Sequence, residues 1–224
     1  NSYEDWIELY KKLIFWELEL ENINDQGMVE ILESQKTEAN SQFGKFIERN
    51  YEDWFKPKAD KPIQSHTLFK ELVVPEIQKK DKPVLFVVID NLRYDQWKAF
   101  ENVVGNYYKL EKEVPYYAIL PTATQYARNA IFSGLTPLEM EKQFPQYWKN
   151  DPEEGGKNLY EAEFLSAQLK RLGLNIKEDY FKITNLAGGK KLVESFKALK
   201  NNDLVTVVYN FVDMLSHART ESKT

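Results

Sequence analysis

The sequence predicts an α/β protein in which a helical bundle or connector, residues 1–80, precedes a three-layer α/β/α domain, residues 81–224. Residues 1–80 carry apolar side chains at helical spacing and no strand-like run. From Pro83 onward, short apolar runs alternate with amphipathic segments, which is typical of helices packed on a mostly parallel sheet. Polar residues follow several of these runs directly, at the sheet edge where open α/β proteins place ligands.

Composition favours a folded protein without a membrane span. Hydrophobic residues make up 42% of the chain and aromatic residues 14%, which is enough for substantial cores. The net charge of −5 gives no whole-chain reason to bind DNA or an anionic membrane. There are no cysteines, which excludes disulfides and thiolate zinc sites, and no run approaches the roughly 20 apolar residues of a membrane helix. We expect a cytoplasmic protein and, because the first residue is not Met, a fragment of a longer one.

The sequence of residues 1–80 predicts three helices. Ser2 and Asp5 suit a capping box before an apolar side that runs from Trp6 to Leu20. A second amphipathic segment extends from Val29 to Phe55, and Ser65 can begin a third helix. Helices without strands suit a bundle that holds a neighbouring domain or a dimer partner.

The second part predicts strands and helices in alternation. Val84–Ile89 is a short, continuous apolar run, which predicts a strand buried on both faces. Further strands are predicted over 114–120, 180–184 and 204–212, and helices over 92–103, 125–132, 160–172 and 190–200. Gly134 and Gly173 can end the second and third of these helices. The composition of residues 143–157 predicts a polar loop, which could form the rim of the site or a lid over it.

Side chains with metal-binding chemistry follow three of the predicted strands. Asp90 follows the first, Thr122 and Thr124 follow the second, and Asp213 with His217 follows the last. Because Asp213 and His217 are four residues apart, one helical turn would bring them onto the same face. Carboxylate, imidazole and a metal-bound hydroxyl oxygen suit zinc, so we expect Asp90, Thr124, Asp213 and His217 to share a zinc site.

Simpler interpretations exist for several of these residues. Asp90 also suits the N-cap of the next helix, and Thr124 could cap the helix that follows it. Thr122 is the alternative to Thr124 as the hydroxyl that acts at this site. Arg93 is better explained as an ion-pair partner of Asp95 or Asp213 than as a phosphate clamp.

The sequences of these segments resemble those of the alkaline phosphatase superfamily, and of PglZ domains in particular. The motifs are VVIDNLRYD, the segment PTATQYARNAIFSGLTP at residues 121–137, and DMLSH, and they occur in the family's order. The resemblance implies that Thr124 is the nucleophile, that Asp90 binds one metal ion, and that Asp213 and His217 bind the other. The helical part resembles the connector of PorX-type response regulators, which joins a receiver to a PglZ domain.

This resemblance implies a phosphohydrolase with two zinc ions that attacks phosphorus through a threonine oxygen, with nucleotide or oligonucleotide diesters as the leading substrates. The resemblance does not decide between diester and monoester substrates. A phosphomutase is a further alternative to a hydrolase. Sulfatase chemistry is disfavoured because the C/S-x-P-x-R context is absent. The resemblance also implies an upstream receiver, a sensor kinase, type IX secretion signalling and a homodimer. The alternative is a signalling module that binds a partner through the same fold, with catalysis weak or lost.

The family's site also needs an Asp-His pair and a further histidine downstream. The chain has two histidines, and His66 lies in the helical part. We therefore expect the remaining zinc ligands to lie beyond Thr224, and the fragment to be inactive alone.

Overall fold

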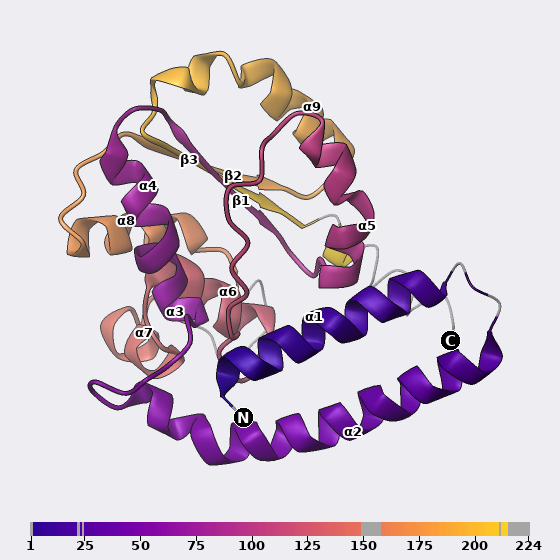
Figure 1. Cartoon of the computed structure of the whole chain (residues 1–224). Coiled ribbons are helices and arrows are strands. Elements are labelled where there is room, and N and C mark those ends of the chain that lie inside the picture. The colour runs from indigo at the N-terminus through magenta and orange to yellow at the C-terminus, as the bar shows by residue number, and fades with distance from the viewer. Residues whose placement is uncertain (1, 22, 24, 149–157, 211, 215–224) are drawn as a thin grey trace. The chain divides into compact units, whose positions relative to one another are not determined.

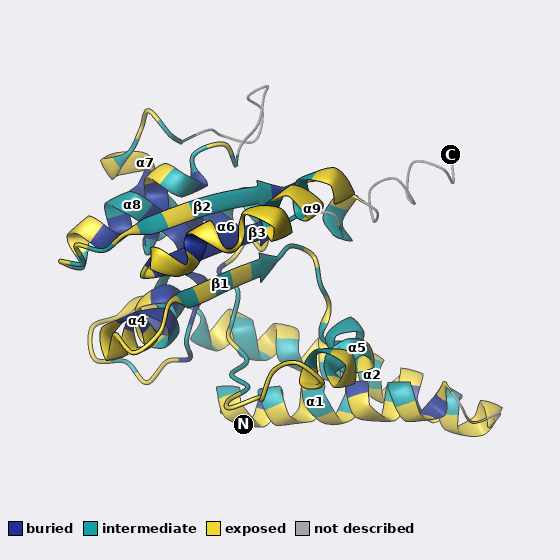
Figure 2. Ribbon diagram, turned by 90° about the horizontal axis from the view of Figure 1, so that it is seen from above, coloured by how far each residue is buried: buried dark blue, intermediate teal, exposed yellow. Residues whose placement is uncertain are grey.

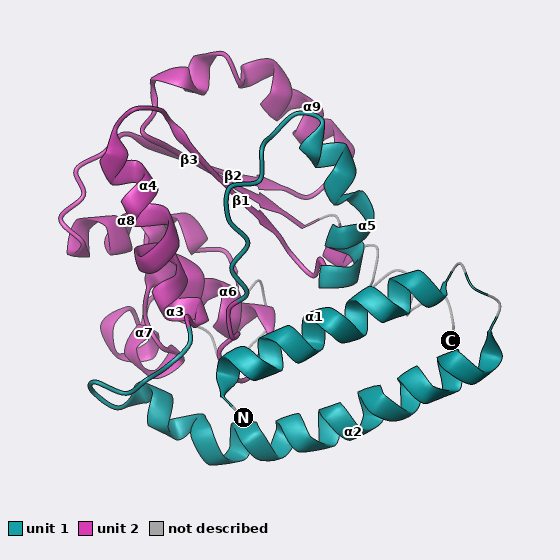
Figure 3. Cartoon of the chain, viewed as in Figure 1, with its two compact units in different colours: residues 1–62, 93–115 teal, residues 63–92, 116–224 magenta. Residues whose placement is uncertain are grey.

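The computed structural model describes residues 2–21, 23, 25–148, 158–210 and 212–214 (Figure 1). These residues form two compact units (Figure 3). The helical unit contains residues 1–62 and 93–115, and the sheet unit contains residues 63–92 and 116–224. The predicted order, helices first and then a mixed α/β region with a small parallel sheet, is confirmed.

In the helical unit, the long helices are α1 (Tyr3–Leu20), α2 (Gln26–Asn50) and α5 (Tyr94–Gly105), and a 3-10 turn, η1, spans Glu52–Phe55. In the sheet unit, the strands are β1 (Val84–Ile89), β2 (Glu178–Ile183) and β3 (Leu204–Tyr209). Its helices are α3 (Ser65–Leu68), the π-helix η2 (Phe69–Val73), α4 (Val74–Lys79), α6 (Thr124–Ser133), α7 (Pro137–Gln143), α8 (Glu161–Arg171), α9 (Leu186–Ser195) and the 3-10 turn η3 (Ala198–Asn201).

The helical unit is held by aromatic contacts between α1 and α2, which lie side by side in Figure 1. The capping box predicted for Ser2 and Asp5 begins α1. Trp6 is buried, and its ring lies 5.4 Å from Phe43 and 5.9 Å from Phe46 on α2. The predicted helical spacing therefore places Trp6, Phe43 and Phe46 in one core, whereas Phe15 and Trp16 of α1 are exposed. Among the described residues, no helix is long and apolar enough to cross a membrane.

The sheet unit is built on three parallel strands in the order β1-β3-β2. Leu204 on β3 pairs with Val84 on β1 and with Glu178 on β2, so all three strands end at the same edge. That shared edge is where ligands of open parallel sheets are held.

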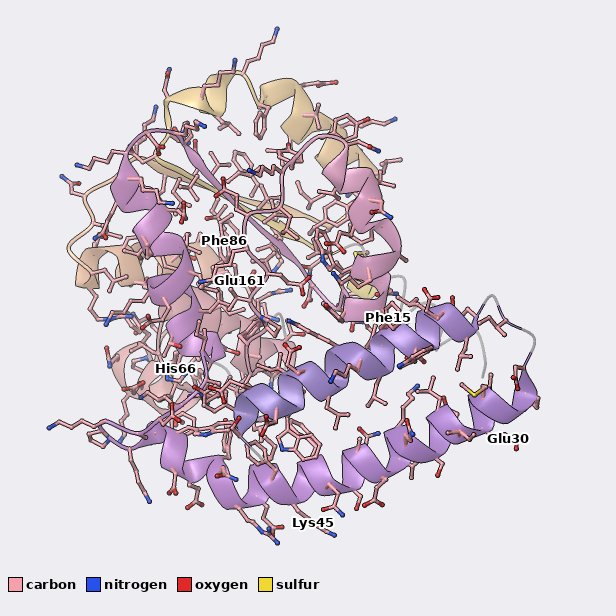
Figure 4. The ribbon with its side chains drawn as sticks, in the orientation of Figure 1. Phe15, Glu30, Lys45, His66, Phe86 and Glu161 are labelled. Atoms are coloured by element: carbon pink, nitrogen blue, oxygen red, sulfur yellow. The ribbon has the colours of Figure 1, made fainter. Side chains whose placement is uncertain are left out.

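Helices cover both faces of this sheet, as the three-layer prediction requires. On one face, η2, α4, α6, α7 and α8 enclose the larger core. Phe86 of β1 lies in that core, with ring centroids 5.6 Å from Phe69 and 6.3 Å from Phe132 (Figure 4). On the other face, Leu192 and Leu199 from α9 and η3 pack on Val205 and Val207. Figure 2 shows buried residues concentrated on α6, α8 and β3, whereas α9 is mostly exposed.

The prediction that Val84–Ile89 is buried on both faces is wrong. Burial alternates along β1, and Leu85 and Val87 are 42% and 46% exposed (Figure 2). In this sheet β1 is an edge strand whose second face is largely open, whereas the central strand β3 is buried from Leu204 to Val208. A continuous apolar run cannot distinguish these two cases, because β-branched residues suit both.

The strand predicted over residues 114–120 does not form. The segment is extended, but its only strand-type pairing among the described residues is one parallel bridge between Tyr117 and Gln64. The Tyr117 N–H donates to the Ile63 carbonyl, and the Ile119 N–H donates to the Ser65 hydroxyl. These backbone groups are satisfied at the start of α3, so no sheet partner is needed.

The compact units divide the chain differently from the predicted boundary at residue 80. Phe69, Val73 and Ile77, on η2 and α4, belong to the core under the sheet, so this segment is part of the sheet unit. The predicted helix ends at Gly134 and Gly173 are confirmed, because both glycines have positive φ angles, of 63° and 70°.

One half-buried carboxylate, Glu178, should make stability depend on pH. Burial raises the pKa of Glu178 on β2, and its Oε2 atom has no hydrogen-bond partner among the described residues. A pKa above the unfolded-state value contributes stability below that value and loses it as pH rises through the folded pKa. We expect Glu178→Gln to match wild type below about pH 4 and to be more stable at pH 7. Chemical denaturation at both pH values checks this, and an equal difference at both would contradict it.

Candidate active site

A buried arginine joins the ends of three elements at the carboxyl edge of the sheet. Arg128, on α6, is 4% exposed. Its Nη1 donates to Asp90 Oδ2 at 2.6 Å and to Asn210 Oδ1 at 2.9 Å, just past β1 and β3 respectively. Its Nε donates to Glu161 Oε1, at the start of α8. The helix after the threonine motif is thereby tied to two strand ends.

Glu161 accepts hydrogen bonds from three side chains near this edge, those of Arg128, Tyr180 and Lys182. It is 1% exposed, and its Oε2 accepts from the Tyr180 hydroxyl at 2.7 Å and from Lys182 Nζ at 3.0 Å. Burial and then the Glu161 charge raise the pKa of Tyr180 well above its ordinary range, so its hydroxyl stays a donor. A buried carboxylate with this many donors is fully compensated.

Asp90 lies where the sequence places it, immediately after β1. Its N–H donates to the Tyr209 carbonyl at 3.0 Å, which continues the parallel pairing beyond the strand, and its side chain is 14% exposed. Burial raises the pKa of Asp90; Arg128 opposes this rise, and the charges of Asp213 and Glu161 add to it. The next helix, α5, begins at Tyr94 with Arg93 as its N-cap, so the hypothesis that Asp90 caps it is wrong.

Thr124 is the first residue of α6, and its N-cap is Ala123. The hypothesis that Thr124 itself is the cap is therefore wrong. Its side chain is partly buried, whereas Thr122 is exposed in the preceding irregular segment. Thr124 and Arg128 are four residues apart, so they lie one above the other on the same side of α6.

Asp213 lies in the helical turn after β3, where the Asn210 carbonyl accepts from Met214 N–H at 3.1 Å. It is near enough to Asp90 for its charge to raise that residue's pKa. The structure thus brings Asp90 and Asp213 together, with Arg128 from α6 between the strand ends. His217 lies outside the described residues. Arg93 pairs with Asp95 at 2.6 Å in the helical unit, as the ion-pair interpretation requires.

The described residues at this edge supply part of the ligand set that a divalent cation needs. The neighbouring carboxylates Asp90 and Asp213 repel each other. A cation between them would offset this repulsion and the cost of burying the charged form of Asp90. Asp oxygens and a threonine hydroxyl are hard oxygen ligands, which zinc and magnesium accept. Within the described part of the chain, no group of three or more His, Cys, Asp or Glu residues forms a cluster that could hold a metal.

Comparison with known families agrees with the fold. Residues 68–224 match the family of the BREX system PglZ alkaline phosphatase-like domain. The chain belongs to the PglZ family. Residues 1–55 match the PorX response regulator linker domain, so both predicted resemblances are confirmed. Among curated proteins, none matches the chain.

The PglZ domain also contains site residues that sequence reasoning missed. Arg128 and Glu161 are central to the network, and Asn210, Tyr180 and Lys182 complete it. One signal was present: Arg128 is a charged residue in the otherwise uncharged helix TQYARNAIFS, four residues after Thr124. Its partners lie 33 to 82 residues away, and no local pattern identifies them.

Proposed function

We propose that this chain provides the PglZ part of a zinc-dependent phosphohydrolase that cleaves phosphodiesters, with nucleotides or oligonucleotides as the leading substrates. Membership of the PglZ alkaline phosphatase-like family supports a phosphatase-like fold. The observation that carries the proposal is the link from α6 to Asp90 through Arg128, with Asp213 beside Asp90. This link supports the proposal because α6, which carries the proposed nucleophile Thr124, is hydrogen-bonded to Asp90, and the charge of Asp213 acts on Asp90.

In this proposal, Asp90 and Thr124 hold one zinc ion, and Asp213 and His217 hold part of the shell of the other. Bound zinc would lower the pKa of a coordinated hydroxyl and offset charge that develops on phosphate oxygens. The chain's own contribution is to present Thr124 at the N-terminus of α6, where the helix dipole favours a phosphate. The Thr124 oxygen attacks phosphorus, the bond to the leaving oxygen breaks as that oxygen gains a proton, and water then cleaves the phosphothreonine.

Replacement of the nucleophile tests this proposal. In the full-length protein with zinc, Thr124→Ala should lower hydrolysis of a bis-aryl phosphate by at least about 10³-fold, because covalent catalysis is lost. The partly buried hydroxyl contributes little to the core, so the thermal midpoint should change little. Thr122→Ala is the matched control and should keep activity within about threefold. If Thr124→Ala stays active, the nucleophile is Thr122 or water, and the proposed mechanism is wrong.

A second candidate is a signalling module whose PglZ domain binds a partner and turns over slowly or not at all. The match of residues 1–55 to the PorX response regulator linker domain favours it. The two functions are compatible if hydrolysis is the output of a cytoplasmic response regulator with an upstream receiver, a sensor kinase and a homodimeric state. Full-length protein that binds zinc yet hydrolyses neither diesters nor monoesters would favour the module without catalysis. Phosphate retained on the product would instead indicate a phosphomutase.

A further inference from the structure

The Arg128 guanidinium is held more completely than an ordinary ion pair requires. Two of its nitrogens make three hydrogen bonds. The partners are Asp90 just after β1, Asn210 just after β3, and Glu161 at the start of α8. A planar guanidinium fixes both the distance and the angle of the groups it binds. Arg128 therefore sets how α6 is oriented relative to the two strand ends.

Stability alone does not account for this arrangement. Removing an arginine and a carboxylate from water is costly, and well-packed apolar residues of similar volume are often as stable as a buried ion pair. Glu161 also has two other donors, Tyr180 and Lys182, so Arg128 is not its only compensation. What Arg128 alone provides is the connection from Glu161 to Asp90 and Asn210.

We propose that Arg128 is a positioning residue, which holds the Asp90 carboxylate at a fixed place relative to Thr124 by bridging it to α6. Glu161 anchors one side of the guanidinium, and this directs Nη1 toward Asp90 and Asn210. The inference rests on the proposed function, because it concerns the placement of a metal ligand and a nucleophile. Partners that orient ligands in this way change metal affinity or activity by about 10- to 100-fold when they are removed.

The chain contains a matched control in Arg171, which lies on α8 and binds the other end of α6. Arg171 donates from Nη2 to the Ser133 carbonyl, at the opposite end of α6 from Thr124. Arg171→Met removes a guanidinium that binds the end of α6 and does not contact Asp90. Arg128→Met removes the bridge, and Arg128→Lys keeps the positive charge but loses the fork that reaches partners on two sides.

The test uses full-length protein and two readouts, zinc affinity by competition with a chromophoric chelator and steady-state hydrolysis of a bis-aryl phosphate. We expect Arg128→Met and Arg128→Lys to weaken zinc binding by about 10-fold or more and to lower kcat by about 100-fold, with KM within about threefold. Arg171→Met should change each value by less than about twofold. Guanidinium ion should restore part of the zinc affinity of Arg128→Ala, whereas uncharged urea at the same concentration should not.

The outcomes separate this inference from the proposed function. If Arg128→Lys folds and matches Arg171→Met in both readouts, while Thr124→Ala is inactive, the positioning role is wrong and the proposed function stands. If Thr124→Ala stays active, the proposed mechanism fails, and zinc affinity still decides the role of Arg128. Absence of zinc binding by wild type overturns both. Should Arg128→Met fail to fold, Asn210→Ala removes one arm without stranding the guanidinium, and unchanged zinc affinity and kcat in it would also overturn the role.

Discussion

Glu161→Gln should lower the free energy of unfolding by about 3–5 kcal/mol, the cost of removing one partner from a buried ion pair. The glutamine amide keeps the shape of the carboxylate but removes its charge, which leaves the buried Arg128 with Asp90 as the charged partner that the structure gives it. Its NH₂ group would also face donors, because Arg128, Tyr180 and Lys182 all donate to Glu161. Urea denaturation monitored by tryptophan fluorescence measures the loss.

Glu163→Gln is the matched control for this prediction. It removes a carboxylate from the same first turn of α8, but Glu163 is exposed. Its effect should stay within about 0.5 kcal/mol, as expected for a surface substitution. A loss below about 1 kcal/mol in Glu161→Gln would mean that water compensates Arg128, and the network would then be too open to position Asp90.

Gly134→Ala should destabilise the protein by about 3 kcal/mol or more, since two separate costs add. Gly134 has a φ angle of 63°, where a side chain costs about 1 kcal/mol. An added Cβ would lie 2.2 Å from Gln168 Oε1. Gln168 cannot move away freely, because it is buried and its Nε2 donates to the Ile131 and Phe132 carbonyls at the end of α6. Displacing it leaves buried carbonyls unpaired, at about 1–3 kcal/mol.

Gly173→Ala separates these two costs. Gly173 has a similar φ angle, of 70°, but no atom outside its own chain neighbours lies within 4 Å of the position that an added Cβ would take, so its substitution should cost only about 1 kcal/mol. In a Gln168→Ala background, Gly134→Ala should then cost about as little as Gly173→Ala, because the obstructing amide is gone. Equal losses for Gly134→Ala in both backgrounds would exclude the clash as the cause.

Local signals in the sequence were sufficient for much of the fold. Glycines at helix ends act through their own φ angles, so Gly134 and Gly173 could be placed without knowledge of neighbours. The apolar run that ends at Asp90 predicted β1 and the position of its carboxylate, because a strand and the residue after it are set by adjacent residues. Pattern reasoning failed at residues 114–120, where the backbone is satisfied by Ile63 and Ser65 rather than by a strand.

By itself, then, the sequence determined the family, the order of helices and strands, and the edge of the sheet that carries Asp90. Only the tertiary structure decided that β1 has one exposed face, that residues 63–80 belong to the sheet unit, and that Arg128 joins Asp90 to Glu161 and Asn210. The reason is physical: periodicity and turn chemistry act over a few residues, whereas the partner of a buried charge is set by which distant segments meet in the core.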